Sequence, residues 1–174
     1  NDAFYKKSLQ ASIIIYPDGS FGQEGFKRQK DFSFLKFNYI EKFSSKLYNI
    51  LFNLQSNPGI AFIYSQFVNK GGTELIAKTL LQNGYSKYPS GEDYKRFILL
   101  DSNITSEQKD ILRKKLNTPD NNYGKNISIV IGSPVVSEGI TFKNIRQIHI
   151  LEPAWNYSRI LQVIGRGIRN NSHS

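Results

Sequence analysis

Arginine recurs at helical spacing in the segment 157–169, close to the end of the 174-residue chain. At about 100° per residue, one face of a helix here would carry Arg159, Gln162, Arg166 and Arg169. No acidic residue shares that face, whereas a solvated helix commonly balances its charges through i,i+4 pairs. A planar guanidinium group can bind two phosphate oxygens at once. The spacing therefore favours a phosphate-facing helix over the alternative of a merely solvated one.

Two glycines, Gly165 and Gly167, lie within the same segment. Each costs a helix about 1 kcal/mol relative to alanine. Such a cost is understandable where a ligand or another segment approaches the backbone closely. The glycines thus add to the case for a binding helix.

The composition indicates a globular domain with an anionic partner. The length allows one domain with a proper core, and 23 basic against 14 acidic residues give a net charge of +9. This balance favours nucleic acid before a membrane surface, although a basic protein kept soluble by its charge would look the same. Cysteine is absent, which excludes disulfides and thiolate zinc sites. We expect a reducing compartment, no metal site and no membrane span, because no apolar run approaches about 18 residues.

The first part of the chain is rich in aromatic residues and lysine. Residues 13–16 are predicted as a short buried strand. Residues 19–34 have no clear period and are predicted as a loop. The apolar residues of 38–55 have helical spacing, which predicts a helix. Aromatic and basic residues together could form a stacking surface for single strands. We favour the alternative that the aromatic side chains pack an irregular extension onto the core.

From residue 59 the pattern becomes regular. Short apolar strands are predicted at 60–64, 97–100, 127–131 and 147–151, with helices at 73–83 and 105–116 between them. Thr105 and Gln108 have the spacing of a capping box. This order is typical of an α/β fold with a mostly parallel central sheet and helices on both faces.

The carboxyl ends of these strands are rich in small and polar residues. In parallel sheets ligands bind beyond such ends. The segments expected on this rim are 65–66, 101–103, 132–133, 137–139 and 152–153. Hydroxyls and backbone N–H groups gathered there suit phosphate binding. His149 alternates with isoleucines in the last strand and is predicted to be structural.

The motifs after the third predicted strand resemble a known family. Residues 133–142, 151–156 and 162–169 are similar in order and spacing to motifs V and VI of superfamily 2 helicases and translocases, with Gln-x-x-Gly-Arg-x-x-Arg as the sixth. Residues 60–66 stand where that family has motif IV. Residues 62–65, 71–72, 124–125, 137–142, 145–150 and 169–173 resemble more specifically a viral branch of that family. This branch comprises the DNA-dependent ATPases of poxviruses and other large cytoplasmic DNA viruses, which include an early transcription factor subunit.

This resemblance implies a RecA-like three-layer fold and a role for each matched residue. Arg169 matches the arginine finger and Arg166 the neighbouring phosphate-contacting arginine, both stabilising charge on the γ-phosphoryl group of ATP. Gln162 matches the leading glutamine, which helps to position the cleft. The positions that match motif V and couple nucleotide to nucleic acid are Glu138, Gly139 and Thr141.

Contacts to the sugar-phosphate backbone are expected on the same rim. The candidates are Ser65, Gln66, Ser133 and Ser137, since hydroxyls and N–H groups grip a backbone without reading bases. The resemblance implies that the partner is a nucleic acid, and DNA is favoured over RNA. The resemblance also implies viral transcription machinery as a further partner. The expected location is the host cytoplasm, in viral factories, or the virion.

The sequence departs from the complete helicase pattern in one respect. It contains no Gly-x-x-x-x-Gly-Lys-Ser/Thr loop and no Asp-Glu-x-His run. We therefore expect a fragment or separately produced domain of a longer protein, with residues 1–37 as an inter-lobe extension and 38–174 as the second RecA-like lobe. ATP and Mg²⁺ would be bound mainly by the missing first lobe, and this chain alone would not hydrolyse ATP.

The favoured hypothesis is thus the second lobe of a nucleic-acid-dependent ATPase or helicase acting in viral transcription or genome processing. A non-enzymatic, basic nucleic-acid-binding module is the alternative, and salt-dependent binding indifferent to ATP would favour it. A doubly wound enzyme of another class is disfavoured, because no Gly-x-Gly-x-x-Gly turn follows the first strand and no acid–base cluster is evident.

Overall fold

The computed structural model of the chain describes residues 2–67, 69–133 and 143–152, with side chains described from residue 5 onward. The helices are α1 (Asp2–Ile13), α2 (Gly22–Arg28), α3 (Phe37–Ile40), α4 (Ser45–Ser56), α5 (Thr73–Gln82) and α6 (Ser106–Leu116), with single 3₁₀ turns η1 (Ser33–Leu35) and η2 (Pro119–Asn121). The strands are β1 (Ile60–Tyr64), β2 (Ser86–Lys87), β3 (Arg96–Leu99), β4 (Ile129–Gly132) and β5 (Ile145–Ile150).

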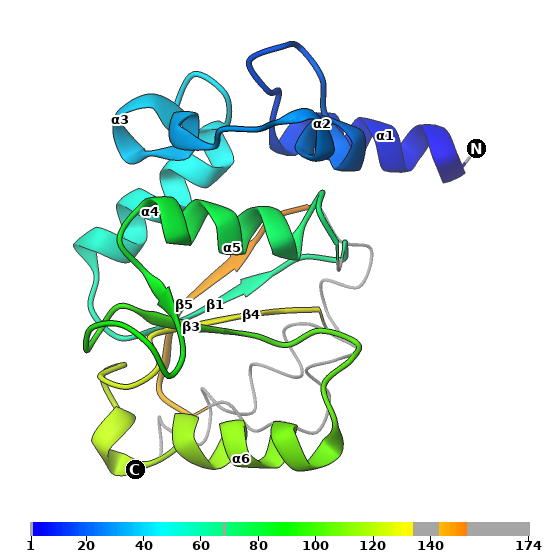
Figure 1. Ribbon diagram of the computed structural model, residues 1–174. Coiled ribbons are helices and arrows are strands. Elements are labelled where there is room, and N and C mark those ends of the chain that lie inside the picture. The colour runs from blue at the N-terminus through cyan, green and yellow to red at the C-terminus, as the bar shows by residue number, and fades with distance from the viewer. Residues whose placement is uncertain (1, 68, 134–142, 153–174) are drawn as a thin grey trace.

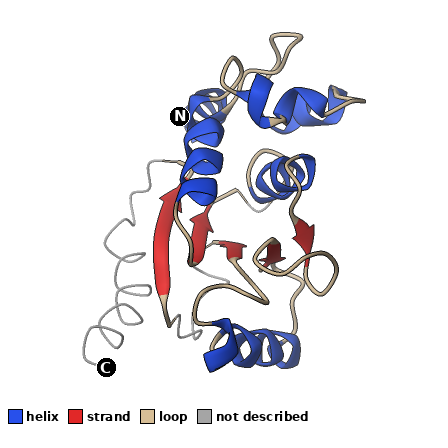
Figure 2. Ribbon diagram, turned by 90° about the vertical axis from the view of Figure 1, so that its left-hand side faces the viewer, coloured by secondary structure: helices blue, strands red, loops and turns tan. Residues whose placement is uncertain are grey.

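The five strands form one sheet in the order β2-β3-β4-β1-β5, and every strand pair in it is parallel. Helix α6 covers one face, and α4 and α5 cover the other (Figures 1 and 2). The helices α1, α2 and α3 lie beyond α4 and α5, on the same side of the sheet. This is the three-layer α/β, RecA-like architecture that the sequence predicts.

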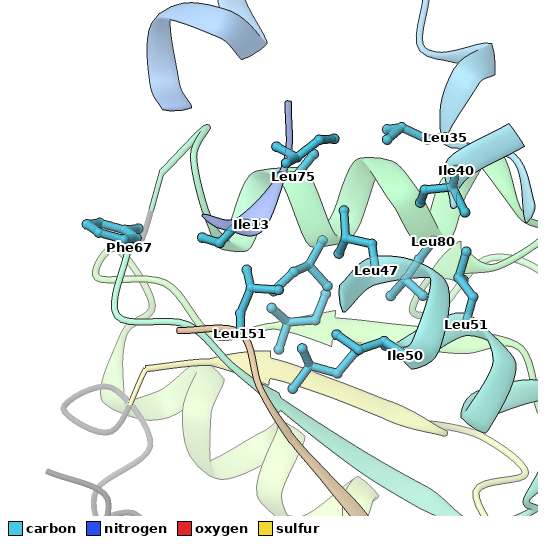
Figure 3. Packing of buried hydrophobic residues seen from close by; sticks show 14 of the residues in the cluster. Ile13, Leu35, Ile40, Leu47, Ile50, Leu51, Phe67, Leu75, Leu80 and Leu151 are labelled. Carbon is cyan, nitrogen blue, oxygen red and sulfur yellow. The ribbon is translucent and has the colours of Figure 1, made fainter. Parts of the chain in front are cut away.

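Each face of the sheet has its own apolar core, because successive strand residues point to opposite faces. In β1, Ile63 joins the cluster under α4 and α5, whereas Phe62 and Tyr64 join the cluster under α6. The first cluster is the larger and includes Ile13, Leu35, Leu47 and Leu75 from the helical layers (Figure 3). Both faces of the central strands are therefore buried, which explains their unbroken apolar runs.

Among the described residues after residue 59, the predicted strands and helices agree with the structure to within two residues. The helix α5 ends at Gln82, and Gly84, two residues beyond it, has φ +87°, which favours glycine. The capping box is also confirmed, since Thr105 accepts a hydrogen bond from the Gln108 N–H and the Gln108 side chain accepts one from the Thr105 N–H. The two-residue edge strand β2 was not predicted, because so short a pairing leaves no periodicity.

The predicted strand at 13–16 is wrong. Ile13 is the last residue of α1, and Ile14 and Tyr16 follow it as buried, irregular backbone. The Ser44 hydroxyl donates to the Ile13 carbonyl at 2.6 Å, and the Ile15 N–H donates to the Phe43 carbonyl at 3.0 Å. A short apolar run is buried in either case, and periodicity cannot tell a strand from a helix end.

Two further predictions before residue 59 need correction. The predicted loop at 19–34 contains α2 and η1, and the predicted helix at 38–55 is interrupted between α3 and α4. Ser44 causes this interruption, because its extended backbone and its side chain, which accepts from the Leu47 N–H at 3.0 Å, start α4 as an N-cap.

The aromatic residues of the first part pack mainly against one another, as the favoured interpretation predicts. Phe34 lies edge-on to both Tyr16 and Phe43, with ring centroids 5.8 and 5.3 Å apart. Phe26 and Phe32 are in contact at 4.9 Å. Because Tyr16 and Leu35 belong to the same cluster as α4 and α5, residues 5–37 share the core of the domain.

Within the residues that the structure describes, no helix is long and apolar enough to cross a membrane. The same residues contain no group of three or more His, Cys, Asp or Glu side chains that could hold a metal ion.

Replacing the capping residue of α6 tests the local part of this fold. Thr105→Ala removes the acceptor for the Gln108 N–H and should lower the free energy of unfolding by about 1 kcal/mol. Thr105→Ser retains the acceptor and should leave it nearly unchanged. Urea denaturation followed by circular dichroism measures both, and equal stability of the alanine and serine variants would contradict the assignment.

Candidate nucleotide and nucleic-acid interface

The carboxyl ends of β1, β4 and β5 lie side by side on one rim of the sheet, toward the right of Figure 1. Tyr64 is in register with Gly132 on one side and with Ile150 on the other. The Ser65 N–H donates to the Gly132 carbonyl at 3.0 Å, and the Leu151 N–H donates to the Tyr64 carbonyl at 2.9 Å. The residues that follow the three strands therefore meet at one place.

Glu152 bridges two of these strand ends from inside the protein. Its carboxylate accepts a hydrogen bond from the Ser65 hydroxyl at 2.5 Å and one from the Gln66 N–H at 3.1 Å. Only 1% of Glu152 is exposed, and Ser65 is fully buried. Charge-assisted hydrogen bonds of this kind are stronger than neutral ones, so that the Glu152 bridge fixes the turn after β1 relative to the end of β5.

The surroundings of Glu152 act on its protonation in opposite directions. Burial is the largest effect and raises the pKa of this carboxyl, while the hydrogen bonds from Ser65 and Gln66 and the positive charge of Lys46 lower it. The net direction is upward. Burial also raises the pKa of Tyr64 to about 12, with a further contribution from the negative charge of Glu152.

Lys46 of α4 reaches the same place from the helical layer. Its ammonium group donates to the Leu151 carbonyl at 3.1 Å and lies 3.4 Å from the Ser12 hydroxyl at the end of α1. A half-buried cation beside a buried carboxyl partly offsets the cost of burying the negative charge. Lys46 thus links the extension, α4 and the rim.

Gly72 closes the turn that leads from β1 into α5. A Cβ atom at this position would lie 2.4 Å from the Ser65 hydroxyl oxygen and 2.1 Å from the Phe67 carbonyl oxygen, so only glycine fits. The Thr73 N–H donates to the same Phe67 carbonyl at 2.9 Å. The first turn of α5 is therefore packed directly over Ser65.

Three of the predicted site residues lie among the described residues, and all three are on the rim. Ser65 is fully buried and Ser133, at the end of β4, is 6% exposed. Gln66 is half-buried. Because the Ser65 hydroxyl holds Glu152, its direct contact with a sugar-phosphate would require that pair to open. The direct contacts of Ser65, Gln66 and Ser133 stay predictions.

The other predicted site residues lie outside the described residues. They are the predicted sugar-phosphate contact Ser137, the residues Glu138, Gly139 and Thr141 of the predicted motif V, and the residues Gln162, Arg166 and Arg169 of the predicted motif VI. The segment 157–169, which the sequence predicts as an arginine-bearing helix, lies outside them as well.

Sequence reasoning placed Glu152 on the rim but gave it no role, and it did not single out Lys46. The available indication was a carboxylate placed directly between an apolar strand and a proline. What the sequence could not show is its partner, since Ser65 is 87 residues away.

His149 is part of the sheet rather than of the rim. It is half-buried in β5, where its Nε2 atom lies 2.8 Å from the Gln147 Oε1 atom. Burial lowers the pKa of its imidazole. This environment fits the structural role that the sequence predicts.

The pH dependence of folding tests the burial of Glu152. Because its pKa is raised in the folded chain, its protonated form stabilises the fold; that contribution is fully present below the ordinary pKa of 4.5 and is lost as the pH rises through the folded value. Glu152→Gln cannot ionise, so the variant does not lose this stability as the pH rises. Relative to the parent chain, the variant should therefore gain stability as the pH rises from about 4 to 8.

Urea denaturation midpoints of the parent chain and the variant, measured across this pH range, give the difference. Glu41→Gln, which changes an exposed glutamate, is the matched control. A stability difference between Glu152→Gln and the parent chain that does not change with pH would contradict a raised pKa.

Comparison with known proteins shows to which family the chain belongs. The helicase conserved C-terminal domain matches residues 42–171. A "Putative ATP-dependent RNA helicase" of Acanthamoeba polyphaga mimivirus is 32% identical over 98% of this chain and 30% of its own length. A "Putative helicase" of Invertebrate iridescent virus 3 is 31% identical over 99% of the chain and 20% of its own length.

A third relative is a termination factor NPH-I homolog of African swine fever virus, 29% identical over 78% of this chain and 24% of its own length. The chain thus spans less than a third of each of these three relatives. The family match covers the five strands and the predicted motifs IV to VI. The chain belongs to the helicase conserved C-terminal domain family and corresponds to the carboxyl-terminal lobe of superfamily 2 helicases.

Proposed function

We propose that this chain is the second RecA-like lobe of a nucleic-acid-dependent ATPase or helicase. The observation that carries the proposal is the match of the helicase C-terminal domain to residues 42–171, on a parallel sheet whose strand ends converge. In such sheets the rim is where ligands bind. The lobe would complete an ATP pocket whose other half belongs to a first lobe of the same longer protein.

The hydrogen bonds of Glu152 hold the end of the proposed motif IV next to the start of the segment that carries the proposed motif VI. Motif IV corresponds to residues 60–66, and the segment with motif VI follows Glu152 in sequence. The carboxylate ties Ser65 and Gln66 to the end of β5. A change at the nucleic-acid contacts of motif IV would thus be passed on to the base of the arginine segment through two hydrogen bonds.

The proposed chemistry of this chain is electrostatic. Arg169 and Arg166 are cationic and fit the phosphate oxygens of ATP rather than Mg²⁺, which would be held mainly by the first lobe. Arg169 would act as the arginine finger and stabilise charge on the transferred γ-phosphoryl group. Gln162 would position the cleft, and Glu138, Gly139 and Thr141 would couple it to the nucleic acid. ATP with Mg²⁺ supplies the hydrolysis free energy that drives the movement of the lobes.

The nucleic acid would be gripped by its backbone on the same rim. Ser65, Gln66, Ser133 and Ser137 are the proposed contacts. We propose DNA before RNA, a role in viral transcription or genome processing, and viral transcription machinery as the partner. The host cytoplasm, in viral factories, and the virion are the corresponding locations. The relative named as a termination factor homolog supports a transcriptional role, and the relative named as an RNA helicase keeps RNA as the competing substrate.

The arginine finger can be tested in the two-lobe parent protein. Arg169→Ala should reduce nucleic-acid-stimulated ATP hydrolysis by about a thousandfold or more, because an arginine finger contributes roughly 10³–10⁵ in rate. Nucleic-acid binding should stay within a few-fold, since the proposed role of the residue is to contact the nucleotide. Steady-state hydrolysis and fluorescence anisotropy measure the two properties.

The matched control for this test is Arg113→Ala. Arg113 lies on α6 and pairs with Asp110 at 2.6 Å at the surface, so its loss removes the same charge away from the rim. It should leave hydrolysis unchanged. If Arg169→Ala kept activity within a few-fold of the parent protein, the assignment of the finger would be wrong.

The choice of nucleic acid is a separate prediction. In the parent protein, single-stranded DNA should stimulate ATP hydrolysis more than RNA of the same sequence and length. The stimulation should require a lower DNA concentration at low salt, because backbone contacts release counterions. Stronger stimulation by RNA would overturn the preference for DNA, and stimulation by neither would favour the non-enzymatic binding module.

A further inference from the structure

A hollow lies at the end of the sheet opposite the rim, where the strands begin. It has a volume of about 470 Å³ and is formed by the end of α4, the residues before β1, β3 and β4, and the residues after α5. Pockets of roughly 300–1,000 Å³ hold small molecules or single groups of larger ligands. Since β1 has five residues at about 3.3 Å each, the hollow is separated from the rim by about 17 Å.

Three tyrosines from three different segments line this hollow. Tyr85 follows α5, Tyr94 precedes β3, and Tyr123 follows η2. Tyr94 is 55% exposed and Tyr123 is 65% exposed, whereas Tyr85 is half-buried. Large aromatic side chains left open to solvent around one concave site are typical of a binding surface.

The backbone holds Tyr94 in an unusual conformation. Its φ is +70°, in the left-handed region that bulky residues rarely adopt. The Tyr94 N–H donates to the Lys125 carbonyl at 2.8 Å. A bulky residue persists in such a conformation only where its surroundings fix it, and such residues gather at functional sites.

Arg96 fixes the loop that presents Tyr94. Its guanidinium group donates to the carbonyls of Ser90 and Gly91 at 3.2 and 2.6 Å, and it pairs with Asp93 at 3.0 Å. The guanidinium is largely buried, with 14% of the side chain exposed. The loop is thus organised before any ligand arrives, which lowers the entropic cost of binding.

The charge around the hollow is positive. Of the described residues that line it, only Lys95 is charged, and none is a carboxylate. Arg146 lies beside it, since its side chain packs over Gly59. The Tyr94 N–H donates to the backbone carbonyl of Lys125 in the neighbouring turn, and Asp93 is paired with Arg96. Tyrosine rings next to lysine and arginine are the combination that holds single-stranded nucleic acid.

We propose that this tyrosine hollow is a second contact for single-stranded nucleic acid, in which a base stacks on Tyr94 or Tyr123 and Lys95 attracts the adjoining phosphate. Every base has a π-face, so this contact would be tolerant of sequence. A strand held at both places would pass from the rim to the amino-terminal edge of the sheet. The inference rests on the proposed function, because it takes nucleic acid as the substrate.

The test is the binding of a fluorescent single strand of about 20 nucleotides, longer than the roughly 4–16 that one binding module covers. Tyr94→Gly removes the ring and also suits the left-handed backbone, so the fold is retained. Tyr123→Ala removes an exposed ring. At least one of the two changes should weaken binding by roughly five- to 150-fold, the range for one lost base stack.

Two controls separate stacking from other effects. Tyr94→Phe keeps the ring and should bind as the parent chain does. Tyr39→Ala removes a ring that is 54% exposed on α3 and does not line the hollow, and it should also leave binding unchanged. Lys95→Ala should weaken binding and reduce its salt dependence, because one phosphate contact is lost.

Failure of this inference is distinguishable from failure of the proposed function. If the parent chain binds the strand and both tyrosine variants bind it equally well, the tyrosine hollow is no nucleic-acid contact, whereas the proposed function stands. If the parent chain binds no nucleic acid, and ATP hydrolysis by the two-lobe protein does not respond to it, both are overturned.

Discussion

The structure depends on one buried carboxylate that ties the ends of two strands together. Glu152 follows β5 and accepts hydrogen bonds from Ser65 and Gln66, which follow β1. Because the group is 1% exposed, losing either partner would leave a buried polar atom unpaired, which is costly. The turn over Ser65 is fixed in addition by Gly72, where no side chain fits. The ends of β1 and β5 are therefore held together at the rim.

The sequence was most informative where the local pattern and the packing agree. The strands β1, β3, β4 and β5 have apolar runs because both of their faces are buried, and α6 begins at a capping box that can be read directly from Thr105 and Gln108. The first 44 residues were predicted less well. There the aromatic side chains pack an irregular path onto α4 and α5, and neither a period of 2 nor one of 3.6 results.

The candidate site was predictable in place but not in detail. A parallel sheet puts the residues after its strands on one rim, so Ser65, Gln66 and Ser133 could be located from the sequence alone. The pairing of Ser65 with Glu152 joins residues 87 positions apart, and no local pattern predicts which donors a buried carboxylate finds. The tyrosine hollow was missed for the same reason, because its three rings come from separate turns that only the fold brings together.

The central claim is that this lobe supplies half of an ATP site and that another lobe supplies the rest. The most direct measurement is nucleic-acid-stimulated ATP hydrolysis by the 174-residue chain alone and by the same chain joined to its proposed first lobe. The account predicts no stimulated hydrolysis by the chain alone and clear stimulation in the joined protein. Stimulated hydrolysis by the isolated chain would contradict it.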